Sequence, residues 1–247
     1  NQGDAITISI KADKAEFAED EAQTFTVSID KPVGRDVVVT LDGGQTVTIK
    51  ANEQTVTYTR PAQGDDVYQD GADLSVALEG AKAADGAAFE NLTLGDPATA
   101  KVVDTVDVVT ATLTANTDSV AEGGEITYTI TLSNEKGAPM DQHGELTFTL
   151  ANGETITIKA GETTGSVTTP VADDAFVGGQ PAIENSIVGA PTMAGGVAFE
   201  KLETAGTPTV AVTDEPGTPG GPVDPENPGN QGDAITISIK ADKAEFA

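Results

Sequence analysis

Acidic side chains recur at matched positions in the two halves of this sequence, and their carboxylates are the groups best suited to chemistry. In each half a glutamate, an adjacent pair of aspartates and a later single aspartate follow in the same order. These residues are Glu19, Asp65, Asp66 and Asp104, and then Glu122, Asp173, Asp174 and Asp214. Crowded carboxylates repel one another, and a Ca²⁺ ion, which takes about six to eight oxygen ligands, removes that repulsion. The recurrence therefore favours Ca²⁺ as a bound ion.

The matched acids stand at a bend in a first strand, in a loop between late strands and at the exit of a last strand. We expect these three places to converge at one end of a domain. Asp107 follows Asp104 closely and could reach the same cluster from across the domain junction. The alternative is a set of solvated turn residues, since aspartate favours turns in any protein.

No residue set in the sequence suits catalysis. The single histidine, His143, lies in a Met-Asp-Gln-His-Gly stretch that we expect to be a solvated loop. The nucleophile elbow, the phosphate-binding loop and the His-Glu-x-x-His zinc motif do not occur, and neither does the EF-hand pattern. We therefore predict that the protein is not an enzyme.

Charge and composition exclude several classes of partner. The 247 residues include 40 acidic and 13 basic ones, which gives a formal net charge of −27. Nucleic acids and anionic lipid surfaces both require a basic face, so neither is expected to bind. No apolar run approaches the ~20 residues of a membrane span, so we expect no membrane insertion. The chain has no cysteine and therefore no disulfide.

An internal repeat predicts the elements that position these acids. Residues 109–132 match residues 6–29, and residues 150–160 match residues 41–51. The Ala/Glu/Lys-rich run after residue 10 looks helical alone, but its counterpart contains threonine, asparagine and paired glycines, so we expect strand, bend and strand in both. Each half has about seven short alternating strands, which is typical of an immunoglobulin-like sandwich. The predicted fold is all-β, with two tandem antiparallel sandwiches in an extended array.

Four segments follow from these repeats. We expect sandwiches at residues 1–105 and 106–215, and a polyproline II linker at residues 216–229, where a proline falls at every third position. Residues 230–247 repeat residues 1–18 letter for letter, so they form the first strand of a further copy. The expected partners are neighbouring repeats of the same chain and, through exchange of this strand, a second copy of the chain.

The chain resembles a known family at these residues. The runs SVAEGGEITYTITL, DDAFVGG and VVDTVDVVTATLTA are similar to the tandem immunoglobulin-like repeats of giant bacterial RTX adhesins of the LapA type. Calx-β domains share the pattern of glutamate, paired aspartates and final aspartate more loosely. The resemblance implies an extracellular protein on the bacterial surface, with a role in biofilm adhesion. It assigns Ca²⁺ to the same matched acids, and the first copy departs from it in having EDEA where the family favours Glu-Gly-Gly.

Two functions from different classes remain open. The first is a structural extender repeat that projects an adhesive tip and is stiffened by Ca²⁺ at domain junctions. The second is a ligand-binding adhesion module, whose expected site is the insertion around Met140–Gly144 in the second half. A filament subunit linked by exchange of residues 230–247 is a third alternative.

Overall fold

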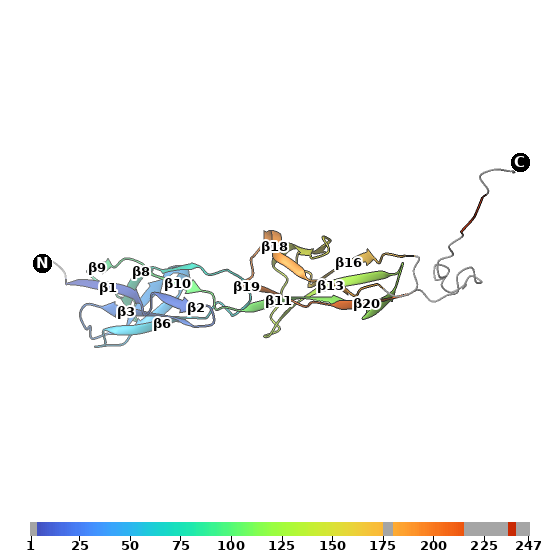
Figure 1. The fold of residues 1–247 in the computed structure, drawn as a ribbon. Coiled ribbons are helices and arrows are strands. Elements are labelled where there is room, and N and C mark those ends of the chain that lie inside the picture. The colour runs from blue at the N-terminus through green and yellow to red at the C-terminus, as the bar shows by residue number, and fades with distance from the viewer. Residues whose placement is uncertain (1–3, 175–179, 215–236, 241–247) are drawn as a thin grey trace, which may run out of the picture. The chain divides into compact units, whose positions relative to one another are not determined.

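The computed structural model describes residues 4–174, 180–214 and 237–240. The chain divides into two compact units, Asn1–Asp107 and Val108–Ala247, and each is described by itself (Figure 1). The linker expected at residues 216–229 and most of residues 230–247 lie outside the described residues. Within the described ranges, no helix has the length and apolar character that a membrane crossing requires.

The first unit is built from short strands that alternate between buried and exposed side chains. They are β1 (Ala5–Ala12), β2 (Glu16–Ala18), β3 (Gln23–Ile29), β4 (Val37–Leu41), β5 (Thr46–Ile49), β6 (Thr55–Arg60), β7 (Asp73–Val76), β8 (Leu78–Ala83), β9 (Asn91–Leu94) and β10 (Ala98–Val103). They form a four-stranded sheet in the order β6-β3-β1-β9 and two three-stranded sheets, β2-β10-β7 and β5-β4-β8. One apolar core lies between these sheets, and β1 shows the alternation clearly, since Ile6, Ile8 and Ile10 are buried in it.

The run that looks helical in isolation is extended in the structure. β1 ends at Ala12, β2 is a three-residue strand around Phe17, and β3 begins at Gln23, which confirms the predicted strand, bend and strand. Phe17 is 1% exposed and packs 6.3 Å from Phe25 between ring centroids. Burial of this side chain outweighs the weak helical preference of its neighbours.

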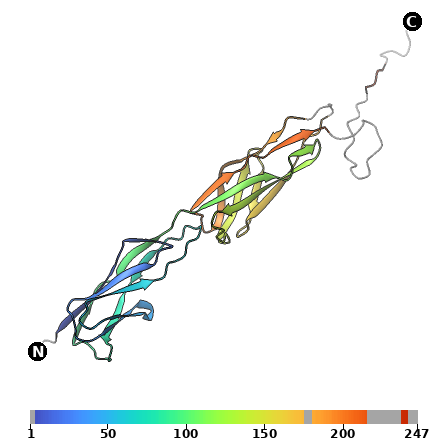
Figure 2. The same cartoon turned by 90° about the horizontal axis from the view of Figure 1, so that it is seen from below.

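The second unit repeats the first, strand for strand (Figure 2). Its strands are β11 (Val108–Ala115), β12 (Ser119–Ala121), β13 (Glu125–Asn134), β14 (His143–Leu150), β15 (Thr155–Ile158), β16 (Thr164–Pro170), β17 (Ile183–Glu184), β18 (Ile187–Gly196), β19 (Lys201–Ala205) and β20 (Thr209–Thr213). Its sheets are β16-β13-β11-β19, β12-β20-β17 and β15-β14-β18. The predicted all-β fold with two tandem immunoglobulin-like units is confirmed.

Each sandwich also contains parallel strand pairs, which the antiparallel prediction did not include. β1 pairs with β3 in the antiparallel sense and with β9 in the parallel sense, and β2 is parallel to β10. The chain's first extended run bends at residues 13–15 and contributes one strand to each layer. β1 thus lies beside β9, and β2 lies beside β10, each parallel to its neighbour. This bend decides where Glu19 lies.

Candidate metal centre

Glu19 follows directly on the parallel pairing of β2 with β10. Its backbone N–H donates to the Val103 carbonyl oxygen at 3.0 Å, and its own carbonyl oxygen accepts from the Gly64 N–H at 3.1 Å. The exposed fraction of Glu19 is 0%. Its carboxyl group is therefore fixed at the end of the first unit where β10 ends.

The two carboxylate oxygens of Glu19 have different environments. Oε1 accepts from both the backbone N–H and the hydroxyl of Thr105, each at 3.0 Å. Oε2 is buried and has no hydrogen-bond partner among the described residues. Burial raises the pKa of Glu19, and the negative charges of Asp66 and Asp104 raise it further, while the Thr105 hydrogen bonds oppose this shift. A buried acceptor without a donor is costly unless a cation supplies the missing interaction.

Aspartates surround Glu19 in two groups. One carboxylate oxygen from each of Glu19, Asp66 and Asp70 lies within 4.8 Å of the others, and the same holds for Glu19, Asp65 and Asp107. Asp104 joins them through its Oδ1, which accepts from the Asp70 N–H at 3.3 Å. The structure therefore brings all five acids predicted for the first half into one region.

A loop between β6 and β7 delivers three of these aspartates. Val67 and Tyr68 are buried and anchor the loop in the core, and the Tyr68 N–H donates to Asp66 Oδ1 at 2.6 Å. Asp70 accepts from Gln63 Nε2 at 2.8 Å. Asp70 is exposed as a whole, but partial burial of its carboxyl group raises its pKa, as do the charges of Asp66 and Asp104.

The sequence comparison of the two halves missed Asp70. In the alignment that pairs Asp65 with Asp173, Asp70 stands opposite Gly178, so recurrence gives no signal for it. Only its position in an acid-rich loop, five residues after Asp65, could have suggested it.

The donor set of the first unit is made of oxygen atoms alone. A cluster of several carboxylates suits Ca²⁺, a hard cation that accepts irregular coordination by about six to eight oxygens. The described residues near Glu19 offer no imidazole to the site, and the chain has no thiolate. The residues present therefore fit Ca²⁺, although the assignment of individual ligands stays a prediction.

The second unit repeats part of this arrangement. Glu122 is 5% exposed, and its N–H donates to the Thr213 carbonyl oxygen at 2.9 Å, as Glu19 does to Val103. Its Oε2 accepts from the Asp174 N–H and from Gln180 Nε2, both at 3.2 Å, and its Oε1 is buried without a partner in the described part of the chain. Gln180 is a contact that the sequence did not suggest.

The other acids predicted for the second unit are less closely gathered. Asp173 is exposed beside Gly123, where a Cβ would lie 3.7 Å from the Asp173 side chain, and Asp214 is half-buried after β20. Within residues 4–174, 180–214 and 237–240, these acids form no group of three as compact as those around Glu19. Residues 175–179, which continue the paired-aspartate loop, lie outside that part.

The insertion in the second half ends in a buried histidine. Contrary to the expectation of a solvated loop residue, His143 is 2% exposed and begins β14. Its Nε2 lies 2.8 Å from the Glu162 carbonyl oxygen, and its ring lies 5.4 Å from that of Phe199. This packing explains the histidine without any ligand at Met140–Gly144.

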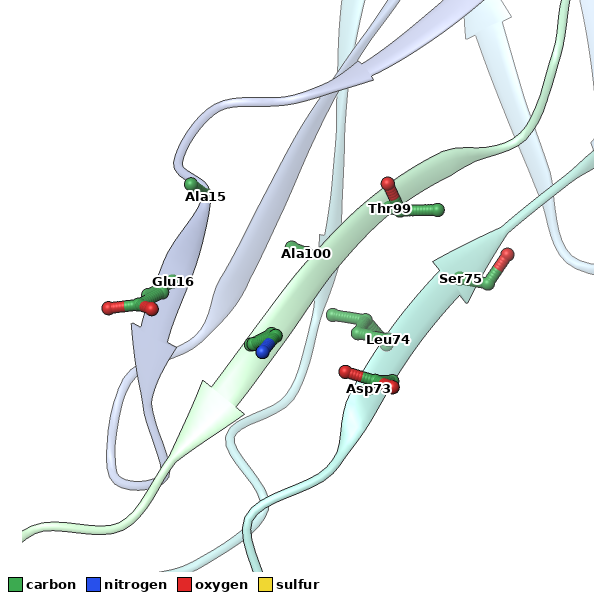
Figure 3. A pocket seen from close by; sticks show the side chains of 8 residues that line it. Ala15, Glu16, Asp73, Leu74, Ser75, Thr99 and Ala100 are labelled. Carbon is green, nitrogen blue, oxygen red and sulfur yellow. The ribbon is translucent and has the colours of Figure 1, made fainter.

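A shallow hollow of about 540 Å³ lies on the first unit against sheet β2-β10-β7 (Figure 3). Lys101 of β10 is in register with Glu16 of β2 on one side and with Asp73 of β7 on the other. Opposite charges on adjacent strands compensate one another and stabilise a sheet. The charges at this hollow are thus explained by strand pairing and indicate no ligand.

Comparison with known proteins gives a family match over both units. The sequence model of the LapA domain matches residues 4–105 and 107–215. No curated protein matches the sequence.

The solved structures that match this chain are distant in sequence. CBD12 from CALX1.2 is 9% identical over 83% of this chain and 99% of its own, with a TM-score of 0.33. The InvE adhesin of Yersinia pseudotuberculosis is 15% identical over 95% of this chain and 65% of its own, with a TM-score of 0.27. FdeC, an Escherichia coli adhesin, is 14% identical over 83% and 63%, also with a TM-score of 0.27. Likenesses this weak support no functional statement, whereas the family match spans both units, and the chain belongs to the LapA domain family.

Proposed function

We propose that the two units are extender repeats of a bacterial cell-surface adhesin and that Ca²⁺ binds at the Glu19 cluster of the first unit. The observation that carries the calcium proposal is Glu19 Oε2, a buried carboxylate oxygen without a partner among the described residues. Asp65, Asp66, Asp70 and Asp107 each place a carboxylate oxygen within 4.8 Å of an oxygen of Glu19. An enzymatic role has no supporting residue set in the described part of the chain.

The extender role follows from where these ligands lie along the chain. Asp104 and Asp107 belong to the segment that leaves β10 and leads to β11 of the second unit. A cation held by these aspartates together with Glu19 and Asp65 would restrict the backbone torsions of that segment. It would also offset part of a net charge of −27, which otherwise makes the chain repel itself. Both effects would keep a chain of repeats extended.

The finer assignments belong to the same proposal. Membership of the LapA domain family supports an extracellular location on the bacterial surface. A role in biofilm adhesion and export as an RTX-type protein are consistent with that location. Binding of an adhesive target would then belong to other parts of such a protein, with these repeats as the spacer.

Removal of Ca²⁺ tests this proposal. Titration of the chelator-treated chain with CaCl₂ should give saturable heat in calorimetry and raise the melting temperature of the first unit. Glu19→Gln should abolish most of that rise, because it removes the buried charge that a cation would neutralise. Glu16→Gln, the same change at an exposed acid on β2, is the matched control and should leave the rise intact.

Solution scattering tests the mechanical part. The maximum dimension of the Ca²⁺-loaded chain should decrease when EDTA is added and recover with excess Ca²⁺. If neither the melting temperature nor the scattering curve responds to Ca²⁺, the calcium proposal is wrong. If the melting temperature responds and the scattering curve does not, Ca²⁺ binds but does not stiffen the chain.

We also propose that residues 234–241 can occupy the place of β1 in a second copy of the chain. The supporting observation is a contrast between identical residues. Ile8 and Ile10 of β1 are 0% and 7% exposed, whereas Ile237 and Ile239, their counterparts in the repeated sequence, are 93% and 100% exposed. The apolar side chains of this segment therefore match the position between β3 and β9 that β1 occupies in every copy of the first unit.

A further inference from the structure

Thr105 connects the exit of the first unit with its buried acid. Its backbone N–H and its Oγ1 each lie 3.0 Å from Glu19 Oε1, and its Oγ1 lies 2.8 Å from Asp65 Oδ1. No other residue in the described ranges donates a hydrogen bond to the Glu19 carboxylate in this structure. Thr105 stands between Asp104 and Asp107, so it holds their segment against the site.

The hydroxyl of Thr105 is shared between two carboxylates. A hydroxyl has a single proton, so it can donate to Glu19 or to Asp65 but not to both at once. With both acids charged, one of the two short contacts places oxygen lone pairs against each other. A cation bound by the two carboxylates removes this conflict, because the hydroxyl then has to orient only one of them.

We propose that Thr105 is a positioning residue that couples Ca²⁺ binding at Glu19 and Asp65 to the order of the exit segment. This inference rests on the proposed calcium function, and it names a residue that is not itself a metal ligand. Thr105 orients Oε1 of Glu19, while Oε2 of the same carboxylate is buried without a hydrogen-bond partner among the described residues. Loss of its hydroxyl releases one end of each carboxylate and loosens the backbone that leads to the second unit.

Hydroxyl deletion tests the coupling in the full chain. Thr105→Val keeps the shape and the N–H but removes the Oγ1 donor, and Thr105→Ala removes it without adding a methyl group. Both should weaken Ca²⁺ binding in calorimetry by roughly 10- to 100-fold, the usual effect of losing a group that orients a metal ligand. Thr105→Ser should restore the affinity. Thr57→Val, which makes the same change at an exposed position of β6, should not alter it.

A second readout works without Ca²⁺. In the chelated chain, amide hydrogen exchange of residues 104–107 should become roughly tenfold faster in Thr105→Val, as expected when a hydrogen bond to a charged group is lost. Thr57→Val should leave these rates unchanged. A general loss of stability would instead accelerate exchange throughout the first unit.

The two readouts separate the failure of each proposal. If the wild-type chain binds no Ca²⁺, the calcium function is wrong, and the exchange rates still decide whether Thr105 orders the exit segment. If the wild-type chain binds Ca²⁺ while Thr105→Val retains its affinity and its exchange rates, the role of Thr105 is overturned. Failure of Thr105→Ser to restore either property overturns it as well.

Discussion

Glu19 is an acid whose surroundings disfavour its charged form. Burial raises its pKa, and the charges of Asp66 and Asp104 add to the effect. A carboxyl group with a raised pKa in the folded state favours folding while it is protonated. That contribution is fully present below the pKa of the unfolded chain, which is about 4.3 for glutamate, and is lost as the pH rises through the folded pKa.

The chelated protein should therefore become more stable as the pH falls through the raised pKa of Glu19 toward the unfolded value of about 4.3. Each unit by which this pKa is raised corresponds to about 1.4 kcal/mol of free energy of unfolding. Urea unfolding in EDTA at several pH values measures the slope. Glu19→Gln should flatten it, because glutamine does not titrate, and the exposed Glu16→Gln should not.

Calcium should reverse the sign of this dependence. The cation binds the deprotonated carboxylate, so saturating Ca²⁺ should make the first unit more stable at neutral pH than at acidic pH. The same slope in EDTA for wild type and Glu19→Gln would show that Glu19 does not carry the effect. Asp70, whose pKa is also raised by burial, would then be the next residue to replace.

Residue types at the site were partly predictable. Glu19 and its aspartates were found because the pattern recurs, and recurrence is visible in one sequence. Asp70 and Thr105 have no such signal, since Asp70 aligns with Gly178 and Thr105 with Glu215. Their roles depend on the folded path of the loop between β6 and β7 and of the segment after β10, which no local pattern specifies.

At the scale of elements, strands were predictable and their partners were not. Alternation of apolar and polar residues identified β1, and the repeat resolved the run that includes β2. The parallel pairing of these strands with β9 and β10 requires contacts between residues more than 80 positions apart, such as Phe17 and Val102. Hydrophobic periodicity reports which face of a strand is buried but not which strand lies beside it.

β14 shows how burial can depend on distant elements. Its first residue, His143, was expected in solvent because its neighbours are polar. The structure packs the ring against Phe199 and places Nδ1 2.6 Å from the Gly144 carbonyl oxygen and Nε2 2.8 Å from that of Glu162. The contacts with Glu162 and Phe199 come from the segments before β16 and β19, and the sequence around residue 143 does not indicate them.

His143→Ala should destabilise the second unit by roughly 2–4 kcal/mol, because it leaves a cavity and an unpaired carbonyl oxygen. Calorimetry at a fixed Ca²⁺ concentration measures the change. Glu145 lies on the same strand with an exposed side chain, so the free energy of unfolding of Glu145→Ala should stay within ~0.5 kcal/mol of wild type. A similarly small change in His143→Ala would indicate that the ring is solvated after all.

At the scale of the whole molecule, the chain carries the same strand sequence twice. β1 occupies its slot between β3 and β9, and residues 234–241 carry an identical set of side chains. When residues 234–241 take the place of β1 in another molecule, they make the same contacts as β1 itself. Because β1 has to leave this place first, the intrinsic free energy of exchange is close to zero, so association is weak and increases with protein concentration.

Sedimentation should therefore show association that increases with protein concentration. Ile237→Asp should abolish it, since the corresponding Ile8 is fully buried and a charged side chain there would lie in the core. Ser238→Asp adds the same charge at the position of Ser9, which is exposed, so it should still associate. Both variants leave β1 itself unchanged. Equal association in the two variants, or a wild-type chain that stays monomeric at every concentration, would rule out strand exchange.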